Sequence, residues 1–194
     1  MPTETPRVYF GFRSPYSRLG LHIVKNAGIS CTVIPFTGPP EGIAFADPTQ
    51  NPAKLAYYRL DVVRMTMRMG LSIGLPDPFD VDFSPANNAA VAAAQDGCAL
   101  EYALAVSDAR WGAGKNISDL AVLRDAATHI NWDIAKVDAA QSDQNIQNAL
   151  AENRTLIESD QVFGVPFAVN GASKYWGHDR FDLFVEESNA FSAR

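Results

Sequence analysis

The sequence predicts an α/β fold in which a strand–helix–strand unit and a strand–strand–helix unit are separated by a large all-helical insertion. Three observations lead to this fold class. A strand, a helix and a second strand follow one another near the start, about 100 residues with helical periodicity come next, and a hairpin and a helix end the chain. With 194 residues, of which 47% are hydrophobic, the chain can bury one good core.

The first unit begins at residues 7–12, a run of β-branched and aromatic side chains that is typical of a strand. Ser14 and Pro15 follow as a helix start, because serine caps free N–H groups and proline is tolerated in the first turn. The helix is expected to end near Gly28, and residues 31–36 form the next strand. Two strands joined by a helix in so short a segment predict a parallel pair with a right-handed crossover.

The middle of the chain is expected to be helical after a loop at residues 37–52, which is rich in proline and glycine. Residues 54–69 have helical periodicity, and Ser84 with Pro85 repeats the helix-start signal before a long alanine-rich helix over 86–109. Further helices are expected at 118–129, 132–137 and 142–153. In the helix expected at residues 54–69, the apolar stripe consists of Leu55, Tyr58, Val62, Met65 and Met69.

Strands return near the end of the chain. Residues 166–170 and 173–176 flank Asn170 and Gly171, a strong signal for a two-residue hairpin turn. Asp179 is expected to open a last helix that ends by Phe191. This order predicts a thioredoxin-like fold (βαβ … ββα), with residues 1–52 and 159–194 as the thioredoxin-like domain and residues 53–158 as the inserted helical domain.

Composition restricts the classes of function. The net charge is −6 with no basic run, which argues against nucleic acid as a partner. The longest apolar stretch, residues 89–94, is too short to span a membrane, and the first residues lack the pattern of a secretory signal. Cys31 and Cys98 have no CxxC or metal-ligand spacing and are interpreted as buried small hydrophobic residues. We therefore expect a cytoplasmic protein without a bound metal or a membrane partner.

Three loops of such a fold are expected to meet at one edge of the sheet: residues 13–17, 162–166 and 176–180. In the first loop, the N–H groups and the dipole of the helix favour negative charge, and the hydroxyl of Ser14 can donate to a thiolate. The alternative is that Ser14 is only a helix cap.

The other two loops also allow two interpretations each. The bond between Val165 and Pro166 is a candidate for cis geometry, which would leave the Val165 backbone free to pair with an extended peptide; the alternative is an ordinary trans proline. His178 is a candidate general base or a solvated loop residue. Asp179 attracts an ammonium group or simply caps the last helix.

The segments FRSPYS, GVPFAVNG and WGHDRFDLF, in this order, resemble the family of 2-hydroxychromene-2-carboxylate isomerases and kappa-class glutathione transferases within the DsbA-like thioredoxin superfamily. The segment PAKLAY, with Asp61 after it, is similar to the P-A-K-x-x-Y-x-x-x-D helix of that family. The resemblance covers nearly the whole chain, including the helical insertion. It places Ser14 where oxidoreductase relatives keep their first cysteine.

The resemblance implies glutathione as cofactor and a homodimer as the assembly. It implies that Ser14 contacts the glutathione sulfur and lowers its pKa, with Tyr16 in the same turn among the cofactor-binding residues. It also implies that Val165, before Pro166, pairs with the backbone of the glutathione cysteine.

The remaining implied contacts involve the two ends of glutathione. His178 and Asp179 would meet the γ-glutamyl end, while Lys54 would meet the glycine carboxylate or an acidic substrate. Asn51 is a further candidate, although the loop before Lys54 is shorter than in the kappa-class enzymes. Residues 38–42 and 72–83 depart from the pattern of the close isomerases, so the second substrate is not indicated.

The resulting hypothesis is a glutathione-dependent isomerase of an unsaturated carboxylic acid similar to 2-hydroxychromene-2-carboxylate. A kappa-class-like transferase that conjugates or reduces small electrophiles is the alternative, and an isomerase without glutathione or a binding protein without turnover stays open. Disulfide exchange is disfavoured, because Ser14 and Ser17 are hydroxyls at both positions of the would-be CxxC motif.

Overall fold

The computed structural model describes residues 5–44, 47 and 50–192. Residues 45–46 and 48–49, which belong to the loop expected at 37–52, lie outside the described part. The elements in chain order are β1 (Arg7–Phe10), α1 (Pro15–Ala27), β2 (Thr32–Pro35), α2 (Pro52–Arg68), α3 (Ser84–Gln95), α4 (Ala99–Trp111), α5 (Leu120–His129), α6 (Ile134–Ala139), α7 (Gln144–Ser159), β3 (Phe167–Asn170), β4 (Ser173–Trp176), the 3₁₀ turn η2 (His178–Arg180) and α8 (Phe181–Ser192).

The four strands form one mixed sheet in the order β2-β1-β3-β4. β1 and β2 are parallel, with Val8 opposite Val33, whereas β1 with β3 and β3 with β4 are antiparallel. Ala168 lies opposite both Val8 and Tyr175, so the hairpin extends the sheet beside β1. The sequence prediction of a thioredoxin-like fold with a helical insertion between β2 and β3 is confirmed.

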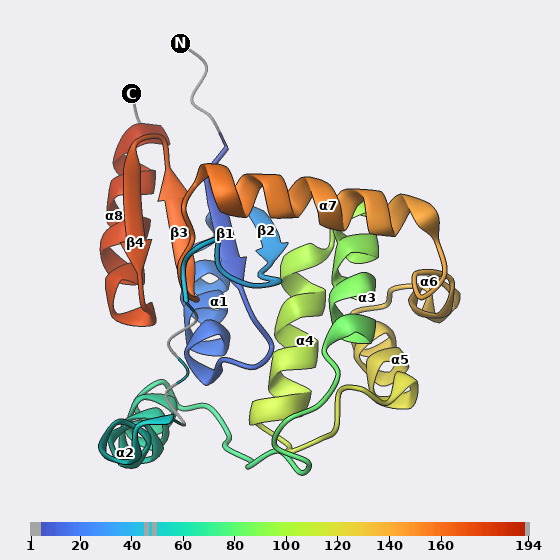
Figure 1. Ribbon diagram of the computed structural model, residues 1–194, viewed down its shortest axis with the longest axis horizontal. Coiled ribbons are helices and arrows are strands. Elements are labelled where there is room, and N and C mark those ends of the chain that lie inside the picture. Colours follow the sequence, from blue (N-terminus) through green and yellow to red (C-terminus); the bar gives the residue numbers. More distant parts are fainter. Residues whose placement is uncertain (1–4, 45–46, 48–49, 193–194) are drawn as a thin grey trace.

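Alternate residues of the strands pack on different layers, as the two-residue period of a strand requires. Val8 and Phe10 join the larger core cluster together with Leu21 of α1 and Phe181 of α8. Tyr9 points to the other face, where it packs in a smaller cluster with Ile157 of α7. Figure 1 shows this arrangement, with α7 crossing one face of the sheet and α1 on the other.

The long helix expected at residues 86–109 is instead two helices, α3 and α4. Gly97 between them has φ +78°, a left-handed conformation that glycine adopts without steric cost, and its N–H donates to the carbonyl of Ala94. The start signal at Ser84 and Pro85 is confirmed, since α3 begins at Ser84, although Ser84 is the first helical residue and not the cap. Phe83 occupies the N-cap position without a side-chain bond, and the N–H of Ser84 donates to Asp82 Oδ1 at 2.9 Å.

The hairpin turn lies one residue later than its sequence signal. Asn170 pairs with Ser173 in the ladder between β3 and β4, so the two-residue loop consists of residues 171–172. Gly171 has φ +57°, which shows that the glycine does supply the positive φ of the turn. The strand bounds on both sides agree with the prediction to within one residue.

The larger core cluster runs through both predicted domains. It contains Phe10 of the sheet as well as Ala89 of α3 and Tyr102 of α4. The predicted boundaries at residues 52 and 158 lie at the start of α2 and near the end of α7. Because the two parts share one core, the division into two domains stays a prediction. Cys31 and Cys98 pack against this cluster as small hydrophobic residues, as interpreted from the sequence, but they are half-buried and not buried.

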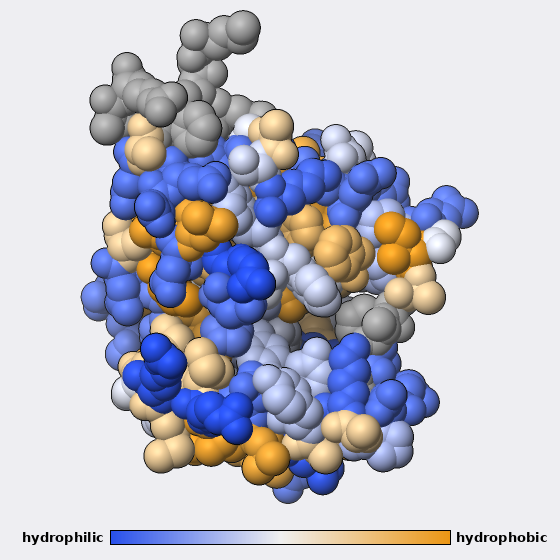
Figure 2. Space-filling model, turned by 90° about the vertical axis from the view of Figure 1, so that its left-hand side faces the viewer, coloured by the Kyte–Doolittle hydropathy of each residue, from blue (hydrophilic) through white to orange (hydrophobic). Residues whose placement is uncertain are grey.

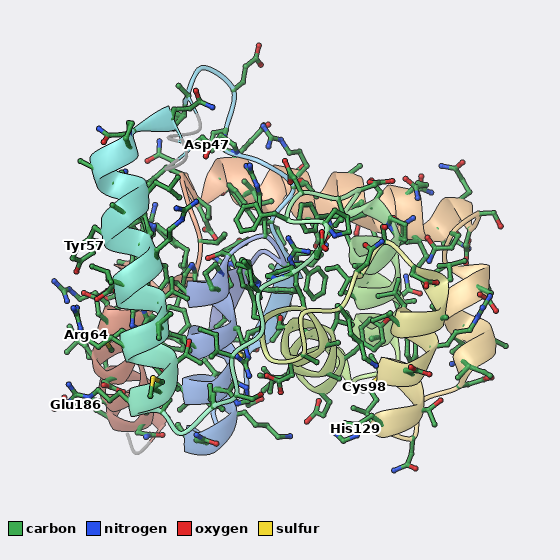
Figure 3. The ribbon with its side chains drawn as sticks, turned by 90° about the horizontal axis from the view of Figure 1, so that it is seen from below. Asp47, Tyr57, Arg64, Cys98, His129 and Glu186 are labelled. Carbon is green, nitrogen blue, oxygen red and sulfur yellow. The ribbon has the colours of Figure 1, made fainter. Side chains whose placement is uncertain are left out.

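The helix α2 packs chiefly on α1 and stands away from the rest of the molecule (Figure 1). Its predicted apolar stripe is correct in direction, since every member of that stripe is half-buried. The opposite face is open to solvent: Figure 3 shows Tyr57 and Arg64 on the side away from α1, and Leu60 is 67% exposed. Within the described ranges, no helix is both long and apolar enough to cross a bilayer.

Candidate functional site

The register of the sheet brings the three predicted loops to one edge. Tyr9 lies opposite Phe167, and Phe167 lies opposite Trp176. The end of β1, the start of β3 and the end of β4 therefore meet, and each is followed or preceded by one of the loops. The expected convergence of residues 13–17, 162–166 and 176–180 is what the topology produces.

Ser14 is the N-cap of α1, and its hydroxyl also points toward the second loop. Its Oγ accepts a hydrogen bond from the Ser17 N–H at 3.2 Å and donates one to the Val165 carbonyl at 3.4 Å. The capping interpretation is thus correct but incomplete. The long second bond can be exchanged for a bond to an anion, because a hydroxyl rotates and charge-assisted hydrogen bonds are the stronger ones.

The turn before α1 is held by buried groups. The side chain of Ser17 is buried, and its Oγ accepts a hydrogen bond from the Gly11 N–H at 3.1 Å. A side chain at Gly11 would crowd Val165, since an added Cβ would lie 3.1 Å from Val165 Cγ2. These contacts fix the distance between the first and second loops.

The peptide bond between Val165 and Pro166 is cis, as expected from the sequence. Val165 is half-buried, and in the described part of the chain its N–H has no backbone hydrogen-bond partner. Among the described residues, its carbonyl accepts a hydrogen bond only from the Ser14 hydroxyl, at 3.4 Å. An extended peptide can therefore pair with both backbone groups of Val165 without breaking a strand of the protein.

Phe163 and Trp176 form an exposed aromatic pair next to Val165. Their ring centroids are 4.9 Å apart, and the two side chains are 42% and 55% exposed. On the face that carries β4 and α8, apolar side chains lie in patches between hydrophilic ones (Figure 2). The sequence offered no signal for this pair, because exposure of an aromatic residue in a strand or loop depends on what packs over it.

His178 is not the solvated loop residue of the alternative interpretation. It is only 8% exposed, and its ring stacks on Tyr16 with centroids 4.8 Å apart and planes 8° apart. Burial lowers the pKa of His178, although Asp179 and Asp61 act in the opposite direction. Its Nε2 is buried without a hydrogen-bond partner among the described residues, so the neutral ring is the stable form in the fold.

Asp179 lies in the 3₁₀ turn before α8 and is exposed. Its carboxylate accepts a hydrogen bond from Arg180 Nη1 at 2.8 Å. The N-cap of this turn is Gly177, and no side chain caps it. Asp179 therefore does not cap η2, whereas its role as a cap of α8 stays a prediction. Beside the bond from Arg180, its exposed carboxylate keeps further acceptor sites for an ammonium group.

Asn51 and Lys54 are both exposed at the start of α2. Asn51 is the N-cap of the helix, and its side-chain oxygen accepts a hydrogen bond from the Lys54 N–H at 3.0 Å. This bond engages the side-chain oxygen of Asn51 as a helix cap. The Lys54 side chain is exposed, so its ammonium group is accessible to a ligand.

Tyr16 is engaged in contacts within the protein. Its hydroxyl donates to Asp61 Oδ2 of α2 at 2.7 Å, and its ring contacts the rings of Tyr58, at 5.5 Å, and of His178. Asp61 appeared in the sequence only as part of a helix motif, without a role. A contact between positions 45 residues apart leaves no local signal that could have revealed it.

A hollow of about 520 Å³ lies beside the Ser14 turn, lined by Arg13 and by residues 80–83. Behind it, Arg110 is fully buried between the rings of Phe83 and Trp111, and burial lowers the pKa of its guanidinium to about 10. The Trp111 Nε1 donates to the Phe12 carbonyl at 2.9 Å, which joins this region to the end of β1. The described residues contain no group of three metal-ligating side chains.

A family model described as a DSBA-like thioredoxin domain matches residues 7–188. Among solved structures, the chain is similar to a 2-hydroxychromene-2-carboxylate isomerase, with a TM-score of 0.76 and 21% identity over 98% of this chain and 96% of that one. It is also similar to a probable DsbA oxidoreductase from Streptomyces coelicolor, with a TM-score of 0.76 and 16% identity over 98% and 91% of the two chains.

A third similar structure is the cytosolic disulfide reductase DsbM from Pseudomonas aeruginosa with GSH, with a TM-score of 0.65 and 16% identity over 96% of this chain and 100% of that one. At such identities the likeness shows a common fold. A comparison with curated proteins gives no match.

Proposed function

The chain belongs to the family of DSBA-like thioredoxin domains, and on this basis we propose that it is a glutathione-dependent isomerase of an unsaturated carboxylic acid similar to 2-hydroxychromene-2-carboxylate. The observation that carries the proposal is the hydroxyl of Ser14 at the N-terminus of α1, 3.4 Å from the Val165 carbonyl. A donor at this place favours an anionic sulfur, because the helix dipole and the N–H groups of the first turn act in the same direction.

The same position argues against disulfide chemistry. Ser14 and Ser17 stand where a CxxC pair would lie, and a hydroxyl cannot attack or form a disulfide. Cys31 and Cys98 lie elsewhere in the fold, and burial raises the pKa of both thiols, that of Cys31 to about 11. The enzyme therefore needs a thiol that it does not itself provide.

The residues at the site suit glutathione. The Val165 N–H lacks a backbone partner within the described chain, and its carbonyl has only the long bond to Ser14. A cysteinyl residue in extended conformation pairs with such a backbone segment through two hydrogen bonds. The exposed carboxylate of Asp179 suits the γ-glutamyl ammonium group, and Lys54 suits the glycine carboxylate.

Glutathione held by Ser14, Val165 and Asp179 would supply a thiolate nucleophile for reversible addition to the conjugated double bond of the substrate, which is the chemistry that isomerisation about this bond needs. Ser14 would donate a hydrogen bond from its hydroxyl to the sulfur, which favours the ionised form of the sulfur near neutral pH. The buried, neutral ring of His178 adds no positive charge beside the γ-glutamyl ammonium group. Protein groups thus hold and orient the reactants, and no proton is consumed overall.

Thermal unfolding in the presence of glutathione tests whether the site binds this cofactor. A ligand that binds only the folded form raises the midpoint of unfolding in proportion to the logarithm of its concentration. We expect such a rise with glutathione and a smaller one with the analogue in which alanine replaces cysteine. An unchanged midpoint at millimolar glutathione contradicts the proposal.

The same thiolate serves a conjugating transferase, so the product decides between isomerase and the kappa-class-like alternative. An isomerase leaves the mass of the substrate unchanged, whereas conjugation adds one glutathione. We expect incubation with unsaturated carboxylic acids to give an isomer of unchanged mass. A product heavier by one glutathione assigns the enzyme to the transferases.

A further inference from the structure

The attachment of α2 to the body of the protein depends on few contacts. Thr66 is the one residue of this helix that is buried, and α2 packs chiefly on α1. The helix also carries exposed apolar side chains, among them Leu60 at 67% and Met67 at 66% exposed. A helix with so little buried surface needs specific polar contacts to keep its orientation.

The hydrogen bond between Tyr16 and Asp61 is such a contact. The Tyr16 hydroxyl donates to Asp61 Oδ2 at 2.7 Å, and the Asp61 side chain is only 14% exposed. Burial and this bond both raise the pKa of Tyr16, so the hydroxyl stays a donor throughout the physiological range. On the solvent side, Arg64 Nη1 lies 3.0 Å from the other oxygen of the same carboxylate and is 62% exposed.

Tyr16 joins three parts of the candidate site. It lies two residues after Ser14, its hydroxyl reaches α2, and its ring stacks on His178 at 4.8 Å. A movement of this one side chain therefore changes the relation between the sulfur-binding turn, α2 and the segment before α8.

Asp61 and Lys54 share one face of α2. They are seven residues apart, which is two turns of an α-helix, so their side chains leave the helix in nearly the same direction about 10 Å apart along the axis. A contact that turns Asp61 toward Tyr16 therefore also turns Lys54 toward the side of α2 that faces α1. Arg64, by contrast, lies on the outer side of the helix (Figure 3).

From these contacts we propose that Tyr16 and Asp61 are positioning residues, whose hydrogen bond orients α2 so that Lys54 meets the glycine carboxylate of glutathione. The inference rests on the proposed function for the identity of the ligand. It assigns to Tyr16 an indirect role: its hydroxyl is used by Asp61 and does not touch the ligand. Loss of the bond weakens glutathione binding through Lys54, while the Ser14 turn keeps its structure.

The test compares three variants of the full chain: Tyr16→Phe, which keeps the ring and its stacking, Asp61→Ala, and the control Arg64→Gln, which touches the same carboxylate from outside. Calorimetry measures the binding of glutathione and of a glutathione ester in which the glycine carboxylate is esterified. We expect Tyr16→Phe and Asp61→Ala each to weaken glutathione binding about tenfold, the usual scale for a lost hydrogen bond to a charged group.

The two ligands separate positioning from contact. The blocked ligand lacks the carboxylate for Lys54, so wild type and both variants are expected to bind it within about twofold of one another. The double variant should be no weaker than the single ones, because both changes remove the same bond. If Tyr16→Phe weakens both ligands equally while Asp61→Ala leaves them unchanged, Tyr16 contacts the ligand directly and the proposal is wrong.

Hydrogen exchange of the ligand-free protein provides a second readout. The amides of residues 55–68 should exchange faster in Tyr16→Phe and Asp61→Ala than in wild type, and Arg64→Gln should match wild type. Unchanged exchange contradicts the orienting role. If exchange changes as expected but wild type binds no glutathione, the contact between the helices stands and the proposed function falls.

Discussion

Replacing Ser14 separates its structural role from its chemical one. As an N-cap, Ser14 accepts a hydrogen bond from the Ser17 N–H at 3.2 Å, and loss of a serine cap costs about 1 kcal/mol of stability. As a donor to a thiolate it contributes about 1.5–3 kcal/mol, the usual range for a hydrogen bond to a charged group. This energy corresponds to a rise of about 1–2 in the pKa of bound glutathione when Ser14 is replaced by alanine.

Two further variants make the comparison sharp. Ser14→Asp keeps a good helix cap but places a negative charge beside the sulfur, so it should retain stability and lose thiolate stabilisation. Asp143 caps α7, and its side chain accepts a hydrogen bond from the Asn145 N–H at 2.8 Å. The variant Asp143→Ala removes this cap. It should lose about 1 kcal/mol of stability and leave the thiol pKa unchanged.

Denaturant unfolding measures the stabilities, and ultraviolet absorbance of the bound thiolate against pH measures its pKa. The expected order of the bound thiol pKa is wild type and Asp143→Ala lowest, Ser14→Ala higher, and Ser14→Asp highest. A Ser14→Ala protein whose bound thiol titrates as in wild type would refute the chemical role. The capping role would then account for the whole effect of Ser14.

Three other predictions concern the fold and its pH dependence. Burial raises the pKa of Asp160, but hydrogen bonds led by the one from Arg7 at 2.7 Å outweigh burial and lower the pKa below its usual value. The carboxylate should therefore contribute its full stabilisation above about pH 4 and lose it as the pH falls through the folded pKa. Asp160→Asn should flatten this part of a plot of unfolding free energy against pH. Burial lowers the pKa of His178, so the unfolded chain binds more protons below about pH 6.5 and stability should decrease there; His178→Phe should remove that slope, and an NMR titration in which the ring charges at an ordinary or raised pKa would contradict the expectation. Trp111→Phe leaves the Phe12 carbonyl without its donor and should cost about 1–3 kcal/mol in denaturant unfolding, whereas an unchanged midpoint would mean that the bond at 2.9 Å contributes nothing.

Local signals in the sequence predicted the outer units of the fold well. Ser14 with Pro15 and Gly28 mark both ends of α1, and Gly28 indeed has φ +65° at the C-cap. These signals succeed because a cap or a left-handed residue is determined by its immediate neighbours. The hairpin turn at Gly171 lies within one residue of its predicted position, because the turn too is determined by its immediate neighbours.

The sequence predicted less where tertiary packing decides. Alanine-rich composition favoured one helix through Gly97, yet the chain turns there so that α3 and α4 can pack against each other. The stacking of His178 on Tyr16 depends on the meeting of two loops far apart in the chain. The residues proposed to bind glutathione could be named from a resemblance, whereas the contacts that hold them in place could not.

Proton release on glutathione binding tests the central claim most directly. Calorimetric titrations at pH 7 in buffers of different ionisation enthalpy report the number of protons released as the ligand binds. If Ser14 and the N-terminus of α1 hold the sulfur as a thiolate, the wild-type protein releases a substantial fraction of a proton per glutathione, and the cysteine-to-alanine analogue releases none. Binding of glutathione without proton release, or no binding at all, would contradict the account.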